Sequence, residues 1–94
     1  MAAEPTQDTQ KQDTHHEDMR KLVEEIAKVL VEDPGQVTVE AFDEDQTTVL
    51  ELRVAPGDLG RVIGRQGRTA KSIRAVLGAA GYKFHKRFAL EILE

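Results

Sequence analysis

Residues 62–73 read Val62-Ile63-Gly64-Arg65-Gln66-Gly67-Arg68-Thr69-Ala70-Lys71-Ser72-Ile73. Within them, Gly64 and Gly67 separate two short apolar patterns. A sharp turn between two helices requires such residues, because glycine adopts positive φ and carries no Cβ atom. A phosphodiester backbone can then come close to the main chain. Gly67 also precedes the second predicted helix, where free N–H groups and the helix dipole favour an anion. The pattern therefore predicts a phosphate-binding loop.

Cationic side chains surround this loop, and Arg65 and Gln66 form its tip. A guanidinium donates paired hydrogen bonds to phosphate oxygens, and an ammonium supplies a compact charge. For Arg74, and for the basic residues near the last predicted strand (Lys83, His85, Lys86 and Arg87), simple solvation is an equal alternative. The residues that we expect to contact nucleic acid are Arg61, Gly64, Arg65, Gln66, Gly67, Arg68, Lys71 and Arg74.

The charge distribution supports a polyanionic partner despite a net charge of −4. Residues 1–52 hold 4 Lys or Arg against 14 Asp or Glu, whereas residues 53–87 hold 9 basic residues against one acid, Asp58. Phosphates respond to the local field within about 8–10 Å rather than to the total charge. The segment around the loop is therefore strongly basic within an acidic chain.

Apolar periodicity predicts the elements around the loop. A helix begins at Asp18, its expected N-cap, and is ended by Pro34-Gly35. Alternating residues 37–42 and 48–54 predict a hairpin with a polar turn at residues 43–46.

Asp58 is the expected cap of a short helix at residues 59–63. A longer helix follows the loop, and Gly81 is expected to end it in a left-handed conformation. Residues 87–92 predict a last strand. Because a hairpin cannot form a core alone, the order helix–strand–strand–helix–helix–strand predicts an α+β fold with three helices on one face of a three-stranded sheet.

Residues 1–17 hold almost no large apolar side chain, which predicts a disordered polar and acidic tail before a folded domain at residues 18–94. His15 and His16 at its end are expected to be solvated rather than to bind metal. The 94 residues include no cysteine, which excludes disulfides and thiolate zinc sites. No apolar run approaches the roughly 20 residues of a membrane span, and no signal-peptide pattern is present, so a cytoplasmic protein is expected.

The segment resembles the GxxG loop of KH domains, with Ile63 and Ile73 at the apolar positions of the I-G-x-x-G-x-x-x-x-x-I signature. The element order is similar to the type II KH topology over residues 19–94. Residues 63–74 also resemble the run I-G-[RK]-x-G-R-x-[AV]-x-[AS]-[IL]-R of the short bacterial KH proteins of the KhpA (YlqC) family. The tail of residues 1–17 departs from the shortest members of that family.

The resemblance implies a non-enzymatic protein whose loop clamps about four unpaired nucleotides of RNA. It implies an RNA chaperone or post-transcriptional regulator, present as a homodimer or paired with a larger KhpB/Jag-like KH protein in the control of cell elongation and division. The alternative is a protein-interaction module in which RNA binding is incidental and the loop itself lies in the interface.

Other ligand classes find no support in the sequence. There is no Ser–His–acid set on converging elements, no G-x-G-x-x-G fingerprint and no Gly-Lys-Ser/Thr of a nucleotide-binding loop, so we expect no cofactor and no metal. Base recognition would instead need apolar residues beside the loop. The candidates for such a groove are Val62, Leu52 and Val54, with Tyr82 and Phe84 available either for base stacking or for burial.

Overall fold

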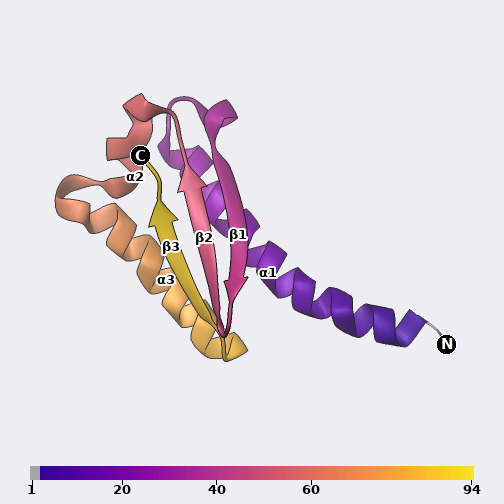
Figure 1. Ribbon diagram of the computed structural model, residues 1–94. Helices are drawn as coiled ribbons and strands as arrows, with labels where there is room; N and C mark the ends of the chain where they lie inside the picture. The colour runs from indigo at the N-terminus through magenta and orange to yellow at the C-terminus, as the bar shows by residue number, and fades with distance from the viewer. Residues whose placement is uncertain (1–2) are drawn as a thin grey trace.

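The computed structural model describes the backbone of residues 3–94 and the side chains of residues 15–94. The element order is the predicted one, and short 3₁₀ turns join the elements at Pro34–Gln36, Pro56–Asp58 and Arg65–Gly67 (Figure 1). The helices and strands are α1 (Ala3–Leu30), β1 (Thr38–Glu44), β2 (Thr47–Arg53), α2 (Leu59–Ile63), α3 (Arg68–Phe84) and β3 (Arg87–Ile92).

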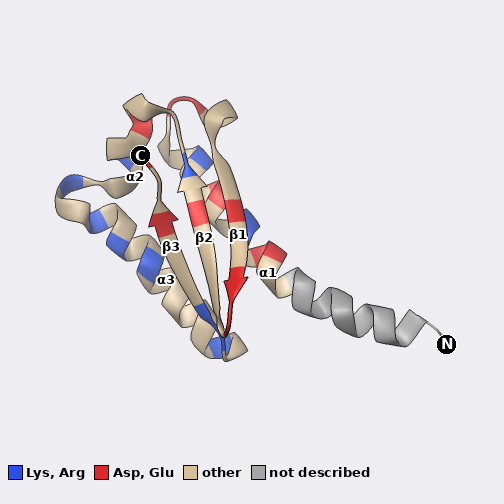
Figure 2. Ribbon diagram, in the orientation of Figure 1, with Lys and Arg blue, Asp and Glu red and all other residues tan. Residues whose placement is uncertain are grey.

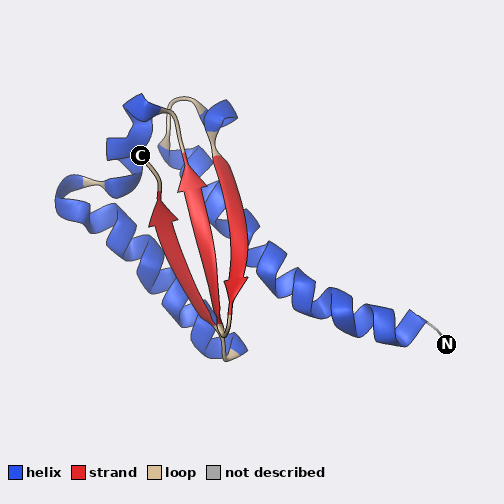
Figure 3. Cartoon of the chain, in the orientation of Figure 1, coloured by secondary structure: helices blue, strands red, loops and turns tan. Residues whose placement is uncertain are grey.

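The three strands form one mixed sheet in the order β1-β2-β3. β1 and β2 are antiparallel, with Ala41 opposite Leu50, and β2 and β3 are parallel, with Leu50 opposite Leu90. The helices lie behind the sheet and leave its other face open (Figure 1 and Figure 3). This arrangement confirms the predicted two-layer α+β fold. The segment with α2 and α3 is the crossover connection that the parallel pair of β2 and β3 requires.

The core lies between the helices and the covered face of the sheet. Alternate strand residues point into it, as the period of two requires. Leu52 and Val62 are fully buried and Val54 nearly so, so the expectation that they line an open groove for bases is wrong. The buried cluster consists of Met19, Val23, Ala27, Val37, Val39, Leu50, Leu52, Val54, Val62, Ile73, Leu77, Phe88 and Leu90.

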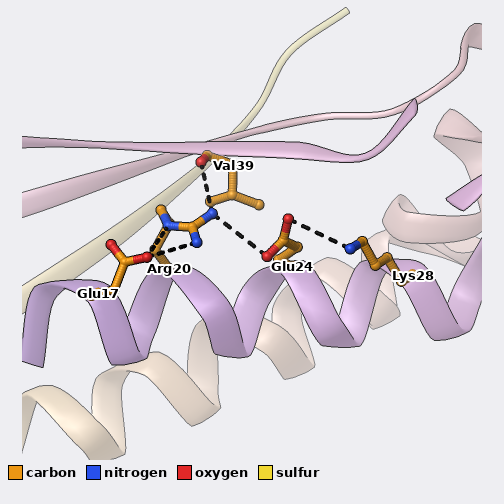
Figure 4. Close-up of polar contacts among 5 residues, drawn as sticks. All are labelled: Glu17, Arg20, Glu24, Lys28 and Val39. Carbon is orange, nitrogen blue, oxygen red and sulfur yellow. Dashed lines mark hydrogen bonds and ion pairs between the residues drawn. The ribbon is translucent and has the colours of Figure 1, made fainter. Parts of the chain in front are cut away.

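The helix α1 runs through Asp18, so this residue is not its N-cap. Charged side chains stabilise the described part of the helix at spacings of three and four residues (Figure 4). Arg20 donates to Glu17 Oε2 from Nε (3.0 Å) and from its NH2 group (2.7 Å), and Glu24 lies within ion-pair distance of both Arg20 and Lys28. These contacts lower the pKa of Glu17 and raise that of Arg20.

The two histidines at the end of the predicted tail contact the domain. The ring of His15 stacks on Phe84 with 4.2 Å between centroids, and His16 Nδ1 lies 3.5 Å from Asp43 Oδ2. The expectation that both are merely solvated is therefore wrong, since the continuous helix carries them over the end of α3 and β1. The disordered tail at residues 1–17 stays a prediction: α1 includes the backbone from Ala3 onward, whereas residues 1–2 and the side chains of residues 3–14 lie outside the described part of the chain.

The turn between β1 and β2 is shorter than predicted. Only Asp45 and Gln46 connect the strands, and Asp45 takes φ 55°, a left-handed conformation that Asp tolerates. Asp43 instead belongs to β1 and accepts a 2.7 Å hydrogen bond from the buried Thr48 hydroxyl. This bond lowers the pKa of Asp43, and the nearby His16 and Lys86 add to the effect.

The end of α3 also differs from the prediction. The helix continues through Gly81 to Phe84, and His85 takes the left-handed conformation at φ 56°. Gly81 serves a different purpose. The chain turns back across it, with the Lys86 amide donating to the Gly81 carbonyl at 2.9 Å, and a Cβ atom at Gly81 would collide with the Lys86 carbonyl oxygen.

Candidate nucleic-acid interface

The loop between α2 and α3 combines three residues with positive φ. Gly64 has φ 79°, Gln66 φ 57° and Gly67 φ 74°, which confirms the positive φ expected at both glycines. The two glycines differ in their surroundings. A Cβ atom on Gly64 would lie 2.8 Å from the Thr69 amide nitrogen, whereas one on Gly67 would meet nothing within 4 Å. Gly64 is therefore needed by the fold, and Gly67 leaves free space outside the loop.

The backbone of the loop is held by its own hydrogen bonds. The Gly64 amide donates to the Gly60 carbonyl at 2.8 Å and the Gly67 amide to the Gly64 carbonyl at 3.1 Å. Gly67 is the N-cap of α3, and no side chain caps that helix. No side-chain oxygen of the described residues thus competes with an incoming anion at the start of α3, where the helix dipole is positive.

Three cations are available at this end of the molecule. Arg65, Arg68 and Lys71 are exposed, and no described carboxylate lies within ion-pair distance of any of them. The NH2 group of Arg68 donates a 3.3 Å hydrogen bond to Oε1 of the exposed Gln66 side chain. Figure 2 shows basic positions along α3 and at the loop, opposite the acidic positions on the strands.

Arg61 is engaged in a network that the sequence did not reveal. Asp58 is 4% exposed, and its two oxygens accept from the Glu32 and Asp33 amides at 3.1 Å each. Asp58 therefore does not cap α2, which has no side-chain cap. Arg61 contacts Asp58 Oδ1 through Nε at 3.4 Å and Glu32 Oε2 through its NH2 group at 3.0 Å. The network fixes α2 against the end of α1 and so positions the loop.

Arg74 is also occupied, because its NH2 group donates to the Leu90 carbonyl of β3 at 3.2 Å. The structure therefore divides the predicted site into two groups. The loop residues with the three free cations are brought together, whereas Arg61 and Arg74 are bonded to the frame. The Arg61–Glu32 and Arg74–Leu90 contacts have no local signature, because these partners lie on distant segments, whereas Asp58 is only three residues from Arg61.

The basic residues near β3 belong to a separate region. The 17 residues of α3 span about 25 Å, which places them at the end of the helix away from the loop. Lys86 Nζ lies 3.5 Å from Asp43 Oδ1, and Lys83 Nζ lies 5.6 Å from the centre of the Phe84 ring. Tyr82 is 87% exposed, so its predicted alternative of burial is wrong, whereas Phe84 is partly buried against the core. Tyr82 and Lys86, together with His85 and Arg87, border an open cavity of about 870 Å³.

Two other features are absent from the described part of the chain, a metal-binding cluster and a membrane-spanning helix. None of its His, Asp and Glu side chains form a group of three or more that is suited to a metal ion. Among the helices described, none combines the length and the apolar character that a membrane crossing needs.

Comparison with known proteins identifies the family. The model of the KhpA/KhpB KH domain matches residues 20–92. The RNA-binding protein KhpA of Clostridium acetobutylicum is 51% identical over 75 residues, which cover 80% of this chain and 100% of that protein. The Aquifex aeolicus protein of the same name is 47% identical over 81% of this chain and 96% of its own length. The Listeria monocytogenes protein is 42% identical over 81% of this chain and 100% of its own.

The names of these relatives describe RNA binding rather than catalysis, which confirms the prediction that the chain is not an enzyme. The fold, with its α–β–β–α–α–β order, agrees with the same assignment. The chain therefore belongs to the KhpA/KhpB KH-domain family.

Proposed function

We propose that this protein binds single-stranded or loop RNA through Gly64-Arg65-Gln66-Gly67 and acts as an RNA chaperone or post-transcriptional regulator. One observation carries the proposal: a loop with two positive-φ glycines lies beside three exposed cations that have no described carboxylate partner. The names of the relatives point to the same ligand. Free space at Gly67 lets a phosphate approach the main chain closely.

The loop residues have different roles in this proposal. Arg65, Arg68 and Lys71 neutralise phosphates, and Gln66, oriented by Arg68, donates through its amide nitrogen. Arg61 and Arg74 act mainly by positioning α2 and α3, because each must leave a protein partner before it reaches RNA. Contacts to the phosphate backbone position a strand without identifying its bases, so sequence preference is weak.

The test is a pair of variants with matched charge changes. Arg65→Glu with Gln66→Glu alters the loop, and Lys21→Glu with Gln36→Glu makes the same changes at exposed positions outside it. We expect the loop variant to lose at least tenfold in affinity for a single-stranded RNA octamer in fluorescence anisotropy at 100 mM salt. The control variant should bind nearly as the unaltered protein does. Equal affinities of the two variants would show that the loop is not the site.

Salt dependence gives a second measure of the same contacts. Three neutralised phosphates predict that log K falls with log salt at a slope of about −2, since each contributes about 0.7 on a single strand. Arg68→Gln should reduce this slope by about 0.7. A slope near zero would exclude phosphate binding by these cations.

We further propose that the protein pairs with a second KH domain, either its own copy or that of a larger KhpB-like protein. The observation that favours pairing is the exposure of two apolar side chains on α3, Val76 at 48% and Tyr82 at 87%. Val76→Glu should shift the sedimentation profile toward the monomer while leaving the RNA affinity of the monomer unchanged. If the Arg65→Glu, Gln66→Glu variant loses self-association instead, the loop lies in the interface. From family membership we also propose a cytoplasmic location and a role in the control of cell elongation and division.

A further inference from the structure

The open face of the sheet carries two rows of side chains that cross all three strands. Phe42, Val49 and Ala89 lie directly opposite one another in the register, and we call them the apolar row. The acidic row lies two residues along the strands and consists of Glu40, Glu51 and Glu91. Figure 2 shows the acidic positions side by side on β1, β2 and β3.

The acidic row lowers the stability of the fold. Neighbouring strands are about 4.8 Å apart, and like charges directly opposite each other are unfavourable. None of the ion pairs among the described residues includes Glu40, Glu51 or Glu91. Phe42 is 45% exposed, although a phenyl ring gains from burial. Folding alone thus explains neither row.

The surface has the shape and the charge of a docking site for a cationic partner. A shallow hollow of about 430 Å³ is lined by residues of both rows, including Phe42, Val49, Glu51 and Glu91, and by Asp43 and Glu44. The helices that carry the RNA loop lie on the opposite face of the sheet (Figure 1). Because carboxylates repel phosphate, the acidic row is unsuited to RNA, although Arg53 and Arg87 lie on the same face two residues beyond the two rows.

We propose that the open face binds a basic amphipathic helix of a partner protein. Residues at i, i+4 and i+7 of a helix are about 5–6 Å apart, which matches the strand spacing of the three glutamates. A helix laid across the strands therefore aligns three Lys or Arg with the acidic row. Apolar residues on its adjacent side cover Phe42 and Val49, because the two rows are about 7 Å apart along the strands.

A second copy of this chain fits the surface less well. The described helix with cations on one side is α3, and its Arg68 and Lys71 are the residues that we assign to RNA. A copy docked through them would lose its RNA site and leave its own sheet free for a further copy, which generates an open chain of subunits. RNA would then compete with docking, whereas a separate partner helix binds whether or not RNA is present.

The test uses a defined probe, a fluorescein-labelled 18-residue peptide with Lys and Leu on adjacent stripes of a helix. The control peptide has the same composition in an order without stripes. We expect the striped peptide to bind in fluorescence anisotropy, and the control to bind at least tenfold more weakly. Equal binding of the two peptides would reduce the effect to general charge attraction and would overturn the proposal.

Variants of the protein identify the surface and separate binding from folding. Glu51→Gln should lower the affinity for the striped peptide about two- to fivefold, the range of an exposed ion pair. Glu51→Lys should lower this affinity by tenfold or more. At the same time Glu51→Gln should raise the melting temperature, because it removes the like-charge repulsion. Binding that falls while stability rises cannot result from misfolding.

The remaining outcomes are equally decisive. Phe42→Ser should lower the affinity for the striped peptide, whereas Arg65→Glu with Gln66→Glu should leave this affinity unchanged. Added RNA should not displace the peptide. Unchanged affinity in both the Glu51→Lys and Phe42→Ser variants would refute the proposal. Displacement by RNA, together with concentration-dependent self-association, would assign the face to a second copy and would equally overturn it.

Discussion

Alanine substitution of the two loop glycines should separate a structural role from a binding role. Gly67 has an αL conformation, which costs a residue with a Cβ atom about 1–2 kcal/mol. Gly64, with φ 79° and ψ 170°, lies in a region that is essentially restricted to glycine and costs other residues about 1–3 kcal/mol. At Gly64 the added Cβ would also lie 2.8 Å from the Thr69 amide nitrogen, and forcing such a contact costs about 1–3 kcal/mol more. At Gly67 no atom lies within 4 Å of it.

The expected stabilities follow from these figures. Alanine also lowers the conformational entropy of the unfolded chain, which stabilises each variant by about 0.4–1 kcal/mol. Gly64→Ala should therefore lower the free energy of unfolding by about 2–4 kcal/mol, and Gly67→Ala by about 1 kcal/mol. One kcal/mol corresponds to roughly 4–8 °C in melting temperature for a domain of this size. Thermal and urea unfolding followed by circular dichroism at 222 nm measures both quantities.

Gly67→Ala should impair RNA affinity strongly, although it loses less stability than Gly64→Ala. The Gly67→Ala protein remains folded, but its new methyl group occupies the space through which a phosphate reaches the main chain. We expect it to bind the RNA octamer at least tenfold more weakly at a temperature where it is fully folded. Equal melting temperatures of the two variants would refute the steric reasoning. Full RNA affinity of Gly67→Ala would refute the close approach of the backbone.

Three further predictions concern residues outside the loop. Asp58→Ala removes a buried acceptor of two amide hydrogen bonds, so the free energy of unfolding from urea titration should fall by about 3 kcal/mol; a loss below about 1 kcal/mol would contradict the network. The lowered pKa of Asp43 means that the unfolded state binds more protons near pH 3–4, where its reference pKa is about 3.9. The unaltered protein should thus have a higher free energy of unfolding than Asp43→Asn, with the full difference present above about pH 5 and lost as the pH falls through the folded pKa. This difference should stay below about 1 kcal/mol, because the Asp43 side chain is 53% exposed. In a Thr48→Val background most of this pH-dependent difference should vanish, and its persistence would assign the shift to other groups. Gly81→Ala should destabilise by about 1–3 kcal/mol, whereas Gly78→Ala, with open space at its Cβ, should be neutral or stabilising by up to about 1 kcal/mol in the same titration.

The order of the elements and the shape of the loop could be predicted because both depend on local sequence. Alternation in residues 37–54 fixes a hairpin, and the helix at residues 59–63 was predicted at its observed bounds. Positive φ at Gly64 and Gly67 follows from the need to reverse the chain within a few residues. Local conformation of this kind is determined by residues within one or two turns.

The errors occurred where distant segments decide the outcome. Asp58 has the sequence signature of a helix cap, yet its partners are amides 25 and 26 residues earlier in the chain. Gly81 has the signature of a helix end, yet it is needed because the chain folds back against it. Arg61 and Arg74 stay predicted RNA contacts, and the sequence did not indicate that each is also bonded to a segment that only the tertiary structure brings near. A single sequence does not contain these proximities as a pattern.

The two arginines that reach the sheet have a consequence for how the protein meets other chains. Arg20 donates to the Val39 carbonyl of β1 at 3.4 Å, and Arg74 to the Leu90 carbonyl of β3. Each outer strand therefore has one backbone acceptor already bonded to a guanidinium from the helix layer. An extended segment that tried to lengthen the sheet would have to displace a charged donor on either side. One bonded acceptor on each outer strand therefore makes the addition of a further strand at that point less favourable.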